Sequence, residues 1–299
     1  MINNICAGIV SFNPDIERLN ENINAIKEQV SKIFLYDNNS DNVLEIERLA
    51  ERINNLVLIK GKKNNGIASA LNRIIDIANK NQFSWCLTLD QDSICSPNLI
   101  NSFSKYISDD EDEIAIICPF ILNNGKYTIE SMKNLDLPKY QIITDPMKCI
   151  TSASLTNINI IRKIGGFNEK LFIDCVDTDI NCRVMENGYK ILQDNEVYLI
   201  QTMGKAKKIR ILNVLYSLTN FDFLRKVMNV PVYGNLRLYY MSRNSRYIRN
   251  TYHNPSRKIS ATYMFAQFLY FTLFFPAKRS RVEMWKYIIK GFRDYEKIK

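Results

Sequence analysis

Several kinds of sequence feature are missing from this chain of 299 residues, and each absence excludes a class of protein. The seven cysteines form no CxxC pair and only one histidine is present, so neither a zinc site nor a disulfide framework is predicted. No GxGxxG follows the first apolar run and no GxxxxGKS/T occurs, which excludes the glycine cradles of dinucleotide-binding and P-loop proteins. Any nucleotide must therefore be bound by other means.

A secretory leader is also missing from the start of the chain. No basic segment, apolar core and small-residue cleavage site follow one another there, and residues 5–12 instead form a strand-like apolar run. With 46% apolar residues, the chain can bury a sizeable core as one large or two modest domains. We therefore expect a folded, cytoplasmic protein.

Acidic residues are scarce in the last third of the chain. Residues 200–299 hold 20 Lys and Arg against 4 Asp and Glu, whereas residues 1–199 hold 20 basic and 27 acidic residues. The basic residues of the last third alternate with aromatic and aliphatic ones and match no nucleic-acid-binding signature. We predict two domains, 1–204 and 205–299, with an anionic membrane surface and no nucleic acid as a partner of the second.

The longest apolar stretch, residues 259–275, is short for a bilayer span, which needs roughly 20 predominantly apolar residues. It also contains four polar residues and is flanked by basic clusters. These features favour a helix that lies in the membrane interface. The alternative is a core helix packed on the catalytic domain.

Strand-like and helix-like segments alternate through the first ninety residues. Strands are predicted at 6–11, 32–36, 56–60 and 83–89, and helices at 14–30, 43–52 and 67–79. This alternation predicts an α/β fold with a mostly parallel sheet flanked by helices, followed by a helical, basic C-terminal region. In such folds ligands bind at the carboxyl ends of the strands.

Asp90 and Asp92 follow the strand predicted at 83–89, so we expect both at the ligand-binding edge of the sheet. Two carboxylates with this spacing can hold a hard divalent cation, and the cation can bind a diphosphate. The alternative is an acidic loop that caps a helix with the help of Ser93 and Ser96.

A second acidic cluster, Asp174, Asp177 and Asp179, lies about eighty residues later. Asp177 precedes a helix predicted at 178–187 that Gly188 ends, so these acids could cap the helix and oppose its dipole. Three acids are more than capping requires, which leaves a carboxylate for proton abstraction.

In their order and spacing, the motifs resemble glycosyltransferase family 2 enzymes of the GT-A (Rossmann-like) fold, and among them the bacterial rhamnosyltransferases. The resemblance covers residues 5 to about 250. Its motifs are GIVSFNP at 8–14, DNNS at 37–40, NGIA at 65–68 with Asn72, LDQDS at 89–93, GGFN at 165–168, FIDCVDTD at 172–179 with Arg183, and YYMSRN at 239–244. Each motif alone is weak, and their order makes the resemblance specific.

The resemblance implies an inverting glycosyltransferase, and the basic C-terminal region predicts that it works at the inner face of the cell membrane. Residues 1–204 would bind the nucleotide sugar and catalyse transfer, and residues 205–299 would contact the acceptor or the membrane. The donor implied is dTDP-L-rhamnose, with a UDP-hexose as the alternative, and the acceptor is a lipid-linked or cell-surface glycan.

The resemblance also assigns roles to individual residues. Asp177 is the catalytic base, with Asp174 and Asp179 as supporting acids. Mg²⁺ or Mn²⁺ is held by Asp92, Asp90 and Gln201, which stands where the family often has a histidine. The remaining assignments are Asn13, Asp37, Asn65, Asp90 and Arg243 for nucleotide binding and Gly165 and Gly166 for the acceptor side. Asp37 could also close its strand in an Asx-turn, and Arg243 could face solvent on a basic helix.

Two other functions remain open. A nucleotidyltransferase would carry a basic, glycine-rich loop after its first strand, where this chain has Ser11-Phe12-Asn13-Pro14. A non-catalytic, membrane-associated nucleotide-sugar binder would not need a base such as Asp177.

Overall fold

The computed structural model of the protein describes residues 4–107, 113–123, 128–201, 206–219, 221, 229–253, 255–274 and 279–298. The chain forms two compact units. The first comprises Met1–Phe172 and Val176–Thr202, and the second comprises Ile173–Cys175 and Met203–Lys299. The domain boundary predicted between residues 204 and 205 lies outside the described residues.

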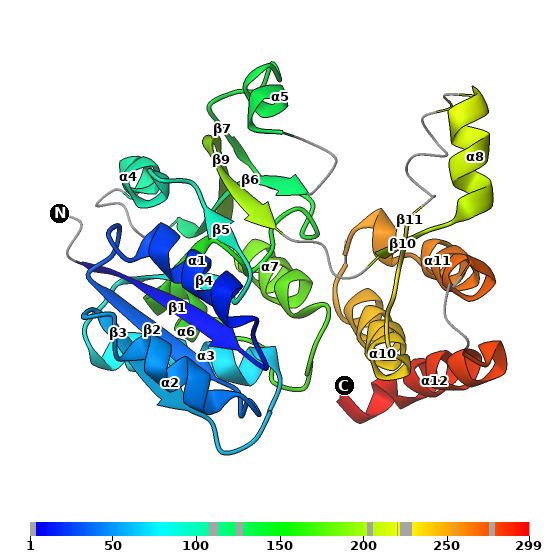
Figure 1. Ribbon diagram of the computed structural model, residues 1–299, viewed down its shortest axis with the longest axis horizontal. Coiled ribbons are helices and arrows are strands. Elements are labelled where there is room, and N and C mark those ends of the chain that lie inside the picture. The colour runs from blue at the N-terminus through cyan, green and yellow to red at the C-terminus, as the bar shows by residue number, and fades with distance from the viewer. Residues whose placement is uncertain are drawn as a thin grey trace. The chain divides into compact units, whose positions relative to one another are not determined.

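The first unit is an α/β domain in which the N-terminal strands and helices alternate as predicted (Figure 1). Its elements are β1 Ile5–Ser11, α1 Ile16–Ile26, β2 Lys32–Asp37, α2 Val43–Ala50, β3 Leu56–Lys60, α3 Ile67–Lys80, β4 Trp85–Asp90, β5 Ile94–Cys95, α4 Leu99–Phe103, β6 Ile114–Asn123, α5 Ile129–Lys133, β7 Tyr140–Ile142, β8 Ser154–Asn157, α6 Ile158–Lys163, α7 Val176–Glu186 and β9 Lys190–Gln201.

Nine strands of this unit form one sheet in the order β3-β2-β1-β4-β8-β6-β9-β5, with β7 paired to β9. The pairs from β3 to β4 are parallel, as predicted, and so is the pair β6-β9. The remaining pairs, which involve β5, β7 and β8, are antiparallel. The sheet is therefore parallel around the predicted ligand-binding edge and mixed beyond it.

The central strand β1 is buried over its whole length, which explains why its sequence is apolar on both faces. Ile5, Ala7 and Ile9 point into the core cluster that also contains apolar residues of α1, α2 and α4. The opposite face of β1 lies against α3. A methyl group at Gly8 would collide with Ile74 of α3, so glycine at this position lets the helix approach the strand closely.

Helix α1 was predicted to run to residue 30, and that prediction is wrong: the helix ends at Ile26. The reason is a side chain distant in sequence. The amide of Asn55 donates hydrogen bonds to the carbonyl oxygens of Lys27, at 2.8 Å, and Val30, at 3.1 Å. These bonds satisfy the carbonyls without a further helical turn.

All seven cysteines are free thiols, and six of them are buried. Cys6 and Cys86 are paired in the register of β1 and β4, and burial raises the pKa of the Cys6 thiol. A buried thiol of this kind packs as a small apolar side chain.

The second unit is mainly helical. Its elements are β10 Ala206–Lys208, α8 Arg210–Thr219, β11 Asn229–Pro231, α10 Asn235–Thr251, α11 Ala261–Phe274 and α12 Arg281–Asp294, with β10 and β11 forming an antiparallel pair. Helices α10 and α12 pack along each other, and α11 contacts both. Val230, Leu238, Met284 and Ile288 share a core cluster with three side chains of α11.

The predicted apolar helix of the C-terminal region is α11, which has an inner and an outer face. Met264, Phe268 and Phe271 are buried in a core cluster formed by residues of the second unit. Phe265 and Leu273 are 60% and 55% exposed on the same helix. Among the described helices, none has the length and apolar character needed to cross a bilayer.

Candidate functional site

The predicted ligand-binding edge exists where the parallel strands β2, β1 and β4 end side by side. The strand register sets Asp37, the last residue of β2, opposite Ser11, and Asp90, the last residue of β4, opposite Val10. Asp37 and Asp90 therefore flank the carboxyl end of β1, one on each side. This is the position that open α/β sheets use for ligands.

Asp37 is buried and hydrogen-bonded. Its carboxylate accepts hydrogen bonds from the backbone N–H of Ser40, at 3.1 Å, and from the hydroxyls of Ser40 and Ser11. The Ser40 hydroxyl also accepts a bond from the N–H of Asn13, at 2.8 Å, while the Asn13 side chain exchanges hydrogen bonds with Asp41. The Asp37 carboxylate therefore closes a local turn, although its bond reaches three residues on rather than the two of the predicted Asx-turn. Ser40 links this turn to Asn13.

The loop before α3 is joined to the end of β2 and to the second acidic motif. The Asn38 side chain accepts a bond from the N–H of Asn65, at 3.3 Å, and donates to the carbonyl of Gly66, also at 3.3 Å. The N–H of Ile67 donates to the carbonyl of Phe172 at 3.0 Å. Gly66 has a φ of +88°, and a side chain there would collide with Phe172, so glycine is required. The Asn65 side chain is exposed.

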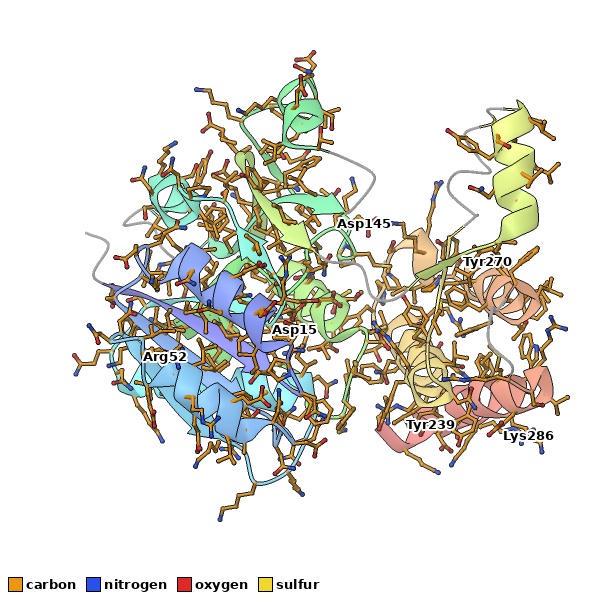
Figure 2. All side chains as sticks on the ribbon, in the orientation of Figure 1. Asp15, Arg52, Asp145, Tyr239, Tyr270 and Lys286 are labelled. Carbon is orange, nitrogen blue, oxygen red and sulfur yellow. The ribbon has the colours of Figure 1, made fainter. Side chains whose placement is uncertain are left out.

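Asp90 ends β4 and Asp92 lies in the turn that follows it before β5, and this turn is held to α1. Asp15, the N-cap of α1 (Figure 2), accepts a bond from the N–H of Arg18, and the Arg18 guanidinium donates to the carbonyl of Asp92 at 2.9 Å. Burial raises the pKa of the Asp92 carboxyl, and its own backbone and Arg18 only partly oppose that effect. Asp92 is therefore a carboxylate whose charge is incompletely compensated.

Four residues that shape this turn were not identified from the sequence. The Ser152 hydroxyl accepts a hydrogen bond from the N–H of Asp90, at 3.0 Å, and it also bonds the Ser93 hydroxyl at 2.6 Å. Asn22 donates to the carbonyl of Asp90, and the Gln91 side chain accepts from the N–H of Phe12. Arg18, already described, is the fourth. Ser152 lies in no recognisable motif, and only the adjacency of β4 and β8 brings it here.

The residues of this edge suit a hard cation that the protein binds only in part. No three Asp, Glu, His or Cys side chains of the described residues are grouped so that they could hold a metal ion alone. Mg²⁺ commonly takes one or two carboxylates and completes its shell with water and substrate phosphates. Asp90 and Asp92 can supply those carboxylates, and a cation would offset the desolvation of Asp92.

Gln201 is the last residue of β9, which pairs with β5 in antiparallel register. The last ladder pair is Ile94 with Ile200, so one further step sets Gln201 opposite Ser93. Gln201 would then lie across from Ser93, the residue that follows Asp92 in the chain. The role of Gln201 as a metal ligand remains a prediction.

Asp177 and Asp179 lie in the first turn of α7. The helix begins at Val176, so the prediction that Asp177 precedes it is wrong by two residues. The Asp177 carboxylate accepts the N–H of Thr178 at 2.8 Å, one of the N–H groups that a helix start leaves without an intrahelical partner. Asp179 is fully buried and pairs with Arg183 at 2.6 Å.

Arg183 also donates to the carbonyl of Ile164 at 2.8 Å, directly before the Gly165–Gly166 turn. Both glycines have positive φ angles, +93° and +69°, and the Asn72 side chain bonds the backbone of Phe167 in both directions. A polar hollow of about 590 Å³ lies beside this turn. None of the predicted catalytic or metal-binding carboxylates lines it, so the acceptor role of the glycines stays a prediction.

Asp174 belongs to the second unit, apart from the two acids that follow it in the motif. Its Oδ1 accepts bonds from the guanidinium of Arg237, at 3.1 and 3.3 Å, whereas its buried Oδ2 has no hydrogen-bond partner. Burial raises the pKa of the Asp174 carboxyl more than Arg237 lowers it. Asp174 and Cys175 both have left-handed φ angles, +64° and +63°, so this segment is strained.

Asn244 holds the strained segment in place. Its side-chain amide is fully buried and donates to the carbonyls of Ile173, at 2.8 Å, and Asp174, at 2.9 Å. Arg243 donates to the Asn244 side-chain oxygen at 2.9 Å and lies over the rings of Tyr239 and Tyr240. Arg243 is thus a buried residue of this network and does not face solvent on a basic helix.

Comparison with known proteins adds to this geometry. Residues 6–167 match the family model described as glycosyl transferase family 2. The chain is 26% identical over 295 residues to the dTDP-rhamnosyl transferase RfbF of Shigella flexneri, and the alignment covers 96% of this chain and 93% of that protein.

Two solved structures share the fold. TarS of S. aureus, crystallised with UDP, has a TM-score of 0.53 and 14% identity, and the match covers 99% of this chain and 90% of that one. GalNAc-T7, crystallised with UDP, GalNAc and Mn²⁺, has a TM-score of 0.54 and 13% identity over 67% of this chain. The matched part is 44% of the GalNAc-T7 chain. These likenesses confirm the predicted GT-A fold.

We expect Asn244→Ala to destabilise the second unit, because it removes the donor of two part-buried backbone carbonyls. The cost of an unsatisfied buried group is about 1–3 kcal/mol. The measurement is the free energy of unfolding in urea. Asn250→Ala, at an exposed position of the same helix, is the control and should change that free energy by no more than about 0.5 kcal/mol. Equal effects of the two substitutions would contradict the anchoring role.

Proposed function

The chain belongs to glycosyltransferase family 2, and on that premise we propose that it is a metal-dependent, inverting rhamnosyltransferase. The donor would be dTDP-L-rhamnose, and the acceptor a lipid-linked or cell-surface glycan. The observation that carries the donor assignment is the similarity to a dTDP-rhamnosyl transferase over 96% of the chain. A UDP-hexose donor is the second candidate, since TarS and GalNAc-T7 were both crystallised with UDP.

We propose that the nucleotide part of the donor lies along the edge formed by β2, β1 and β4. Asp37 would accept hydrogen bonds from the pyrimidine base, with Asn13 and Asn65 on the loops to either side. An N–H of the base would compete with Ser40 for the Asp37 carboxylate, because Ser40 already donates to it. Arg243 would reach the diphosphate only through rearrangement of its bond to Asn244, so its nucleotide role is the weakest of the predicted set.

Asp90 and Asp92 would hold Mg²⁺ or Mn²⁺ against the diphosphate, with Gln201 as a further oxygen ligand. The bound ion supplies positive charge that offsets the charge developing on the leaving diphosphate. Arg18 keeps the turn that carries Asp92 fixed to α1 through the Asp92 carbonyl. The carboxylate itself is thereby left for the cation.

Asp177 would act as the base that takes the proton of the acceptor hydroxyl as that oxygen attacks the anomeric carbon. The resemblance of the 172–179 motif to the family's motif carries this assignment. Within the motif, Asp174 and Asp179 pair with Arg237 and Arg183. Those pairs support the assignment of Asp174 and Asp179 as supporting acids. They orient the segments on either side of Asp177.

We further propose that the second unit attaches the enzyme to the inner face of the cell membrane. Large apolar side chains are exposed on three of its helices, among them Leu218 on α8, Phe265 on α11 and Val282 on α12. Residues 235–298 carry 13 Lys and Arg against 3 Asp and Glu. Exposed apolar groups among basic ones suit the interface of an anionic bilayer.

Product analysis tests the reaction itself. With dTDP-L-rhamnose, Mn²⁺ and a lipid-linked acceptor, we expect dTDP to be released together with one new glycosidic bond, detected by mass spectrometry. Faster turnover of UDP-glucose or UDP-galactose would replace the rhamnose assignment with the second candidate. A nucleotidyltransferase would instead form a nucleotide sugar from a sugar phosphate. A non-catalytic binder would retain the donor without forming a product.

Asp92→Asn should weaken metal-dependent nucleotide binding without lowering the melting temperature at pH 7. The pKa of Asp92 in the folded protein is raised above its ordinary value of 3.8, so ionisation of this group opposes folding as the pH rises past that value. Asn at this position carries no charge, so the substitution removes the free-energy cost of burying the ionised carboxylate. Calorimetric titration with dTDP and Mn²⁺ measures the loss, and Glu45→Gln on the exposed face of α2 is the control. Unchanged affinity in Asp92→Asn would remove the residue from the metal site.

Asp177→Asn should lower the transfer rate at least about 100-fold, because a positioned general base contributes typically 10²- to 10⁴-fold. Donor affinity should be retained, since the residue acts on the acceptor hydroxyl. Single-turnover transfer and donor titration separate the two effects. If Asp174→Asn loses more activity than Asp177→Asn, the base lies three residues earlier than assigned.

A further inference from the structure

The second unit contains an apolar pocket of about 230 Å³ between α10, α11 and α12. Most of the side chains around it are aliphatic or aromatic, including Met264, Phe268, Trp285 and Ile288. An apolar cavity of about 150 Å³ can hold a benzene-sized group, so this pocket has room for a short hydrocarbon segment. Its lining is too apolar for a sugar, which needs several polar groups.

Two arginines are among the residues that line this pocket. Arg246 and Arg249 are three residues apart on α10, so both project from the same face of the helix. In the part of the chain that the structure describes, neither forms an ion pair with a carboxylate. Burial and the neighbouring Arg246 lower the pKa of Arg249, so an anion at this position would stabilise its charged form.

Arg246 is held in a defined position. Its guanidinium carbon lies 3.9 Å from the ring centres of both Phe292 and Tyr295, and Nη1 donates to the carbonyl of Phe292 at 2.7 Å. A guanidinium fixed in this way offers its remaining N–H groups in a preorganised geometry that suits phosphate. The pocket lining thus combines apolar side chains with a guanidinium that is held in a fixed position.

We infer that this pocket binds one anionic phospholipid of the membrane, with part of an acyl chain in the slot and the phosphate on Arg246 and Arg249. The side chains that surround the opening favour a bilayer lipid. Phe265, Ile289 and Phe292 line the pocket and are 60%, 46% and 45% exposed, and a bilayer with basic residues at its surface would cover them together with the slot. The inference rests on the membrane association proposed above and is independent of the transfer reaction.

Trp285 provides a direct reporter, because it lines the pocket and the chain has only one other tryptophan. Trp85 is buried in the first unit and its indole N–H has no hydrogen-bond partner, so Trp85→Phe should be tolerated. In that background, dihexanoyl phosphatidylglycerol is titrated below its micellar concentration. We expect a saturable change in Trp285 fluorescence, and a much weaker response to dihexanoyl phosphatidylcholine, which has no net charge.

Arg249→Gln should weaken the binding of this lipid about tenfold or more, since a hydrogen bond to a charged group is lost. Ala261→Phe, at an exposed position on the pocket's edge, should weaken it to a similar extent without any change in charge. The control is Lys286→Gln on α12 (Figure 2), which removes the same charge outside the pocket. Its affinity should stay within about twofold of the parent.

Three results would overturn the proposal: no saturable response, equal losses in Arg249→Gln and Lys286→Gln, or farnesyl phosphate binding more than about tenfold tighter than the phospholipid. The last result would assign the pocket to a prenyl-linked acceptor. Co-sedimentation with phosphatidylglycerol vesicles tests membrane association separately. Vesicle binding without a saturable response to the monomeric lipid would retain the proposed function and remove the pocket.

Discussion

A carboxylate that leaves water must be compensated by hydrogen bonds or by a cation, and the arrangement of this protein's acidic residues depends on that constraint. Asp37 accepts bonds from Ser11 and Ser40, and Asp179 pairs with Arg183. Asp92 is only partly compensated, since Arg18 bonds its carbonyl and burial still raises the pKa of its carboxyl. It is also the carboxylate for which the family motif implies a bound cation.

The sequence predicted the strand ends well, because a buried parallel strand is a continuous apolar run and the polar residue after it marks the edge. Asp37 and Asp90 were located in this way, and the register of β1 confirms that they flank one strand. The antiparallel part of the sheet could not be predicted in the same way. Strand β5 has two residues and β7 has three, too few for a periodic pattern.

Contacts between distant residues were equally inaccessible from local patterns. Ser152 bonds Asp90 across 62 residues, and Asn244 bonds Asp174 across 70. The end of α1 was misjudged because an asparagine from a later loop satisfies its last carbonyls. The motif YYMSRN can be recognised in the sequence, but its structural role cannot. That role depends on the hydrogen bonds from Asn244 to the carbonyls of residues 173 and 174. These bonds lie within the second unit, to which residues 173–175 belong.

The buried thiols of the first unit have a consequence for how its opening could be followed. Cys6 and Cys86 are inaccessible between β1, β4 and α3, and the raised pKa of Cys6 keeps its sulfur protonated and unreactive. An alkylating reagent can then modify them only while the sheet is separated from the helix that covers it. The rate at which these thiols are labelled therefore measures how often the sheet and the helix separate, without any added probe.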